Sequence, residues 1–211
     1  MRTLHGVRCL ASAVPRALLL ATALFASACT SSGTARPALM EVQPGGFTLT
    51  QEAGAGVGAR GDFDDALRLL EEERYAAGID LLREVVEAAP HATAAWINLA
   101  IAQRAIGDLE GAEASLAKAL ALSPRHPAAH NELGIVYRRT GRFDQARESY
   151  EKALAVYPDL HFARRNLAIL CDLYLGDMSC ALEHYELYTQ AVPEDAEAAM
   201  WIADLRNRVG R

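Results

Sequence analysis

The fold is decided by two consecutive stretches, residues 93–126 (TAAWINLAIAQRAIGDLEGAEASLAKALALSPRH) and residues 127–160 (PAAHNELGIVYRRTGRFDQARESYEKALAVYPDL), because the second repeats the pattern of the first. Proline marks the same register, with two spacings of 34 residues and a last one of 35, at Pro90, Pro124, Pro158 and Pro193. A column of small residues keeps the spacing at Ala66, Ala100, Gly134 and Ala168. A bulky column keeps it at Leu82, Leu116, Tyr150 and Tyr185. A period of this length predicts one supersecondary unit repeated four times.

Each unit is expected to be two helices joined by a tight turn. Gly107 and Gly141 can end the first helix of their units, because glycine adopts a left-handed backbone without steric cost. The first unit has Glu73 where the turn glycine belongs, and in the fourth unit Gly176 comes one residue late, so that unit carries an extra residue. A single helix pair cannot bury its apolar face, so the pairs must stack on one another.

These units resemble the tetratricopeptide repeat, and the resemblance covers about residues 59–194. It implies an all-α fold, a right-handed superhelical solenoid of helix-turn-helix repeats. The repeat region at 62–193 divides into units at about 59–92, 93–126, 127–160 and 161–194. Residues 194–211 are predicted to form a C-terminal capping helix, whose Met200, Trp201 and Leu205 pack on the last repeat.

The start of the chain has the layout of an export signal. Residues 1–16 carry three arginines and no acid, and residues 17–28 are apolar or small, a run too short to span a bilayer. The small residues before Cys29 resemble the lipobox of bacterial lipoproteins, although Ala26 stands where that family usually has leucine. We therefore expect residues 1–28 to be cleaved and Cys29 to be lipidated. The alternative is an ordinary secreted protein that is cut near this cysteine.

Localisation follows from the same resemblance. Residue 30 is Thr30, whereas an aspartate after the lipidated cysteine tends to retain family members in the inner membrane. The resemblance thus implies a lipid-anchored protein of the cell envelope, on the outer membrane and facing the periplasm. Residues 29–61 are rich in glycine and are predicted to form a flexible tether, even though the run 47–50 alternates like a strand.

Charge and motifs exclude several classes of protein. The chain has 21 basic and 27 acidic residues, and residues 1–28 hold three of the arginines, so the mature part has 18 basic residues and a net charge of −9. This acidity argues against binding to nucleic acid or to anionic membrane surfaces. The sequence contains no GxSxG, P-loop, HExxH or CxxC pattern. We therefore predict no enzyme, no cofactor and no metal site, with His126 and His130 solvated or packed.

A scaffold that binds other proteins or peptides is the function that the resemblance implies, through a concave groove lined by the first helix of each unit. The alternative is an enzyme or small-ligand binder of the envelope that uses the repeats as a platform. Repeat lipoproteins of this kind resemble factors for pilus assembly, outer-membrane assembly, peptidoglycan machinery and TonB-type energy transfer. The partner and the oligomeric state stay open.

The 34-residue register places candidate partner-binding residues in that groove. An apolar line runs through Leu67, Ile101, Ile135 and Ile169. Polar residues run beside it at Arg104, Arg138 and Arg139, with Asn131 and Arg165 one turn back. Because guanidinium groups pair well with carboxylates, an apolar floor with an arginine margin suits a partner segment that bears acids. The alternative is that the isoleucines pack against neighbouring repeats and the arginines only solubilise the surface.

Two further cysteines lie in the last repeat. Cys171 falls in its first helix and Cys180 starts its second, and an exported protein lives where disulfides persist. A disulfide between them would lock the irregular turn at Gly176. The alternative is a pair of buried free thiols, because cysteine often behaves as a small hydrophobic residue.

Overall fold

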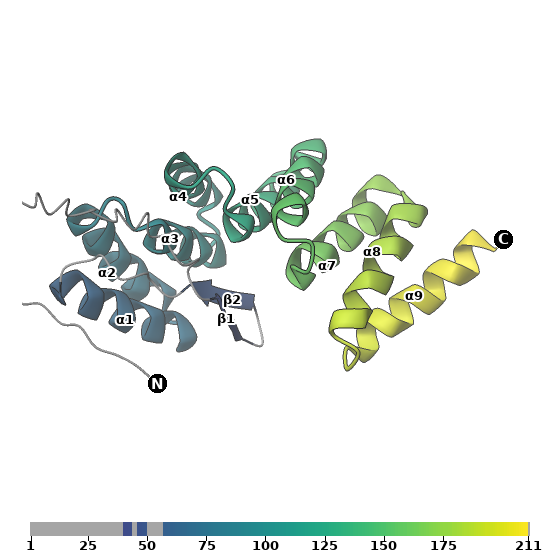
Figure 1. The fold of residues 1–211 in the computed structure, drawn as a ribbon, viewed down its shortest axis with the longest axis horizontal. Helices are drawn as coiled ribbons and strands as arrows, with labels where there is room; N and C mark the ends of the chain where they lie inside the picture. The colour runs from purple at the N-terminus through teal and green to yellow at the C-terminus, as the bar shows by residue number, and fades with distance from the viewer. Residues whose placement is uncertain (1–39, 44–45, 50–56, 211) are drawn as a thin grey trace, which may run out of the picture. The chain divides into compact units, whose positions relative to one another are not determined.

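The computed structural model describes residues 40–43, 46–49 and 57–210. The predicted signal peptide and Cys29 lie outside the described residues. The described helices follow one another as pairs along the chain (Figure 1). Their bounds are α1 Val57–Glu71, α2 Tyr75–Ala88, α3 Thr93–Ala105, α4 Leu109–Leu122, α5 Pro127–Arg139, α6 Phe143–Val156, α7 His161–Leu170, α8 Met178–Ala191 and α9 Ala196–Val209. The all-α solenoid that the resemblance implies is confirmed for the described repeats.

The segment predicted as a tether differs from that prediction in two places. β1 (Met40–Gln43) and β2 (Gly46–Leu49) form an antiparallel hairpin, so the alternating pattern of run 47–50 does produce a strand. Helix α1 starts at Val57, five residues before the predicted boundary at 62. Residues 60–62 of this extension are exposed, and the first core residues of the helix are Phe63 and Ala66, inside the predicted boundary.

The turns between paired helices have the predicted backbone. Gly107, Gly141 and Gly176 have φ angles of 87°, 76° and 65°, which is the left-handed region that ends a helix. Glu73 takes the same conformation with φ 57°, although a side chain makes it costly there. The second helix then begins at a capping aspartate in repeats two and four, where Asp108 and Asp177 accept hydrogen bonds from backbone N–H groups.

The extra residue of the fourth repeat is absorbed inside a helix. Helix α7 continues into a five-residue π-helix, η1 (Cys171–Leu175), before Gly176 ends it. A π-helix accommodates one residue more than an α-helical turn, so the insertion predicted from the late glycine appears as a local widening.

The core lies between the paired helices. The small columns are buried under the bulky ones, as with Gly134 beneath the fully buried Tyr150. The capping helix α9 packs on α8 through Ile202 and Leu205, while Met200 is 64% exposed, so the prediction that Met200 packs on the last repeat is wrong. The buried stripe of α9 runs through Ala198, Ile202 and Leu205, and Met200 lies on the opposite face of the helix. In the part of the chain that is described, no helix combines the length and apolar character needed to cross a bilayer.

Candidate functional site

The first helices of the four repeats, α1, α3, α5 and α7, form one row, which strand β2 contacts at α3. Helix α1 contacts α3, α3 contacts α5 and α5 contacts α7, whereas the even-numbered helices make no comparable contacts among themselves. The first helix of each repeat therefore lies on an inner side and the second helix on an outer side. We call the side of α1, α3, α5 and α7 the inner surface, and all of the predicted groove residues lie on these helices.

The apolar line predicted for the groove is only partly open. Leu67 is 8% exposed and belongs to the core. Ile101, Ile135 and Ile169 are half-buried and pack against the core from the inner surface. The structure thus corrects the expectation that all four repeats present this line to a partner, because the first repeat uses its member for packing.

A polar network ties three inner helices together. The Nε of Arg104 donates to Oε2 of Glu132 at 2.8 Å, and the Glu132 side chain is only 5% exposed. Asn131 donates to the other oxygen of Glu132 at 3.2 Å and accepts from Nδ2 of Asn166 at 3.0 Å. Asn131 is therefore buried within the network, and the structure corrects its assignment as a residue that reaches a partner.

Sequence reasoning missed Glu132 and Asn166, the acid and the amide of this network. The signal was available, because Asn98, Glu132 and Asn166 form a polar column at the 34-residue spacing. Buried polar groups need hydrogen-bond partners, so a periodic polar column on an inner helix face indicates a network of this kind.

Arg138 and Arg139 lie at the end of α5. A terminal nitrogen of Arg139 donates to the backbone carbonyl of Arg104 at 2.6 Å. Arg138 is half-buried, and its guanidinium carbon lies 5.8 Å from the centre of the Tyr174 ring. The Tyr150 hydroxyl lies beside this guanidinium, and burial raises the pKa of Tyr150 to about 12, so the phenol is neutral at physiological pH.

Arg165 connects the inner surface to the capping helix. Its Nε lies 3.9 Å from a carboxylate oxygen of Asp195, and its guanidinium carbon lies 5.2 Å from the centre of the Trp201 ring. Asp195 also caps α9 by accepting from the N–H of Ala198 at 3.0 Å, and it accepts from the Tyr188 hydroxyl at 2.8 Å. Arg165 therefore helps to hold the cap as well as lining the surface.

Two family-model matches cover this architecture, at residues 91–159 and 125–193, and both are described as tetratricopeptide repeat. A further match of the same description covers residues 58–72. The chain belongs to the tetratricopeptide repeat family. None of the curated proteins is significantly similar to it.

Solved structures share the fold of these tetratricopeptide repeats. MamA 41-end from Desulfovibrio magneticus RS-1 is 19% identical, with a TM-score of 0.64 over 74% of this chain and 88% of that one. PilF of Pseudomonas aeruginosa is 21% identical, with a TM-score of 0.65 over 71% of this chain and 68% of that one. Likeness at this level of identity supports the solenoid fold and nothing finer.

A disulfide joins the two helices of the fourth tetratricopeptide repeat. Cys171 and Cys180 are bonded, with Cα atoms 5.9 Å apart, so of the two alternatives the structure contains the bond. A carboxylate oxygen of Asp177 lies within 4.8 Å of both sulfurs, which is a spacing that could suit a metal. Zinc binds cysteine as a thiolate, however, and these sulfurs are bonded to each other, while Asp177 already pairs with Arg147 at 3.1 Å.

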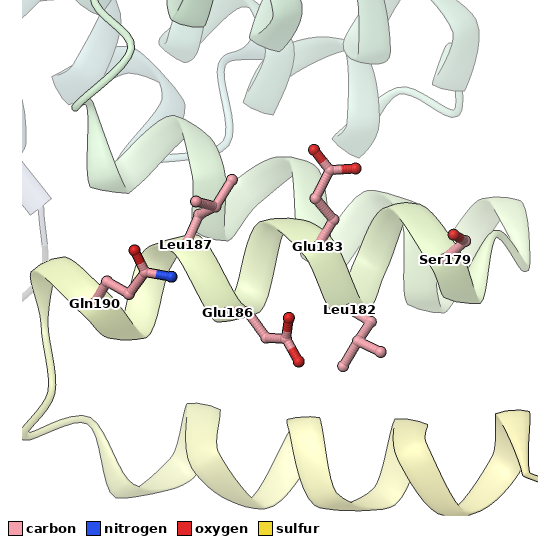
Figure 2. Close-up of a pocket in the computed structure, with 6 residues that line it drawn as sticks. All are labelled: Ser179, Leu182, Glu183, Glu186, Leu187 and Gln190. Atoms are coloured by element: carbon pink, nitrogen blue, oxygen red, sulfur yellow. The ribbon is translucent and has the colours of Figure 1, made fainter.

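A shallow hollow runs along the outer helix α8 and holds no convergent reactive set. Figure 2 shows that Glu183 and Glu186 point to opposite sides of the helix, so their carboxylates do not converge. Paired acid–base chemistry needs groups that converge on one reacting atom. The remaining lining residues are Ser179, Leu182, Leu187 and Gln190.

Proposed function

We propose that this protein is a membrane-anchored tetratricopeptide repeat scaffold, which binds partner proteins on its inner surface and supports assembly of a cell-envelope complex. The observation that carries the proposal is the continuous inner surface of α3, α5 and α7, with half-buried isoleucines bordered by arginines. An apolar strip with a charged margin matches the anatomy of a surface that binds a peptide or an amphipathic helix.

The anchor is the second part of the proposal. The basic, apolar and small segments before Cys29 support export and lipidation at that residue, and Thr30 supports the outer membrane, with the repeats facing the periplasm. Two or three acyl chains would hold the protein durably, because each buried methylene contributes about 0.8 kcal/mol. Pilus, outer-membrane, peptidoglycan and TonB-type machineries are the complexes that such a scaffold could serve.

Site-specific crosslinking in the native cell tests the binding surface. A photoreactive residue in place of Ile135, on the inner surface, is compared with the same residue in place of Glu148, which is exposed on the outer helix α6. We expect a discrete crosslinked partner from position 135 and none from position 148. Equal crosslinking from both positions would show that the inner surface is not the binding site.

Mass spectrometry of the membrane-extracted protein tests the anchor separately. We expect a mature chain that begins with a lipid-modified Cys29 and a Cys29→Ser variant that moves to the soluble fraction. An unmodified N-terminus at another residue would contradict the lipidation proposal and leave the binding surface untouched.

A further inference from the structure

The inner surface carries equivalent arginines that differ in their counter-ions. Arg104 and Arg138 are separated by 34 residues and so occupy the same position in consecutive repeats. Arg104 is neutralised by Glu132, which stands 28 residues further along. The residue 28 positions after Arg138 is Asn166, whose amide donates to Asn131. The third unit therefore keeps the arginine, as Arg138, but the residue that corresponds to Glu132 is the neutral Asn166.

Arg138 consequently carries a charge that no acid balances in the described part of the chain. None of the ion pairs among these residues includes Arg138, and its Nε is buried without a hydrogen-bond partner. The neighbouring Tyr150 hydroxyl is also buried without a hydrogen-bond partner, and it is neutral. Partial burial of a cation without a counter-ion costs free energy. The carboxylate of a partner protein should therefore bind Arg138 with a more favourable free energy than it would bind an arginine that is already paired.

An apolar contact surface adjoins this guanidinium. Tyr174 is 44% exposed, and its ring centre lies 4.9 Å from that of Phe143 and 5.8 Å from the Arg138 guanidinium carbon. Leu173, its neighbour in η1, is 68% exposed. Both side chains belong to the π-helix produced by the extra residue, which distinguishes this repeat from the others.

We propose that Arg138 and Tyr174 form the anchor point for an acidic segment of a partner protein. The carboxylate of an internal aspartate or glutamate pairs with the Arg138 guanidinium, and an aliphatic or aromatic side chain next to it in the partner packs on Tyr174. Planar guanidinium groups bind carboxylates through paired hydrogen bonds, and aromatic rings supply contact area at low entropic cost. This inference rests on the proposed scaffold function and names the partner chemistry of its inner surface.

Selection from a random-peptide phage library tests the anchor, with the purified full-length protein as bait and no free carboxyl terminus on the displayed peptides. We expect enrichment of peptides that place aspartate or glutamate beside leucine, tyrosine or phenylalanine. A selected peptide, synthesised with an amidated C-terminus, is then titrated by fluorescence anisotropy. Arg138→Gln should weaken its binding by roughly ten- to a hundredfold, because a hydrogen bond to a charged group contributes about 1.5–3 kcal/mol.

The matched control is Arg125→Gln, which removes an exposed arginine from the loop between α4 and α5 and should leave binding unchanged. A peptide whose acid is replaced by the corresponding amide should bind wild type and Arg138→Gln with equal affinity. Once the peptide carboxylate is gone, removal of the guanidinium that pairs with it should cost no further binding energy. Asn166→Glu places a carboxylate in the fourth unit, at the position relative to Arg138 that Glu132 has relative to Arg104, and should weaken binding of the acidic peptide as Arg138→Gln does. Tyr174→Ser, at an exposed position, gives a second measurement if Arg138→Gln does not fold.

The anchor is overturned if no peptide is selected, if the selected peptides lack acids, or if Arg138→Gln and Asn166→Glu leave binding unchanged. Crosslinking at position 135 separates this failure from failure of the scaffold function. A partner that still crosslinks there while Arg138→Gln has no effect refutes the anchor alone. Equal crosslinking from positions 135 and 148 refutes the inner surface itself.

Discussion

The contact between Gly134 and Tyr150 allows the packing of paired helices to be tested by mutation. A Cβ added at Gly134 of α5 would lie 2.4 Å from Cε1 and 2.6 Å from Cδ1 of Tyr150 in α6. Attractive carbon contacts lie at about 3.5–4.0 Å, so the overlap is about an ångström. The Tyr150 ring is fully buried and has no room to retreat. We therefore expect Gly134→Ala to destabilise the protein.

The change in the free energy of unfolding caused by Gly134→Ala is the difference between two opposing effects. Alanine gains about 1 kcal/mol over glycine inside a helix, while overpacking a tight core costs about 1–3 kcal/mol. Because the overlap is with a buried ring rather than a flexible chain end, we place the cost near its upper limit. The net loss in the free energy of unfolding should be about 2 kcal/mol, or roughly 4–8 °C in melting temperature for a protein of this size.

Chemical denaturation of two sets of variants checks this reasoning. Repeats one and two pair alanine with leucine at these positions, so in a Tyr150→Leu background the same Gly134→Ala change should become stabilising by about 1 kcal/mol. Gly61→Ala is the matched control, because nothing lies within 4 Å of the added Cβ, and it should stabilise the wild type. If Gly134→Ala stabilises the wild type as Gly61→Ala does, the close-packing argument is wrong.

Further predictions concern the first turn, the disulfide and pH. Glu73→Gly should raise the free energy of unfolding by about 1 kcal/mol, because Glu73 has φ 57°, and an unchanged urea midpoint would contradict this. The disulfide joins cysteines that are 9 residues apart in the sequence, and its reduction should lower the free energy of unfolding by about 2.5 kcal/mol in urea denaturation. A double variant with Cys171→Ala and Cys180→Ala should be unaffected by reductant. Burial lowers the pKa of three histidines below the value of about 6.5 expected in the unfolded chain, so the unfolded state binds more protons and stability falls as pH drops below about 6.5. Melting temperatures measured between pH 7 and pH 5 should decline accordingly, and a flat profile would contradict the burial of His126, His161 and His184.

The spacing of prolines and small residues predicted the helix pairs, because stacking imposes one period on every unit. The late Gly176 predicted an extra residue but not its place, since an insertion can lengthen a turn or widen a helix, and here it forms a π-helix at Cys171–Leu175. Helix α1 begins at Val57, before its apolar pattern, which starts with the buried Phe63. Exposure was the least predictable property. The register gives the direction of Leu67 and Ile135 but not how far neighbouring side chains cover them.

The polar column of Asn98, Glu132 and Asn166 explains why arginines at equivalent positions have different roles. Arg104 and Arg138 occupy the same place in their repeats, and they differ in the residue that faces them from the first helix of the next repeat, which is Glu132 for Arg104 and Asn166 for Arg138. A charge that is neutralised within the fold contributes to stacking, whereas a charge without an internal partner is available for binding. In a solenoid each repeat contacts only its neighbours, so exchange of one acid for an amide moves an arginine from the first role to the second without disturbing the rest of the array. Specificity on such a surface can therefore be set by the neutral member of a polar column, a residue that makes no contact with the partner itself.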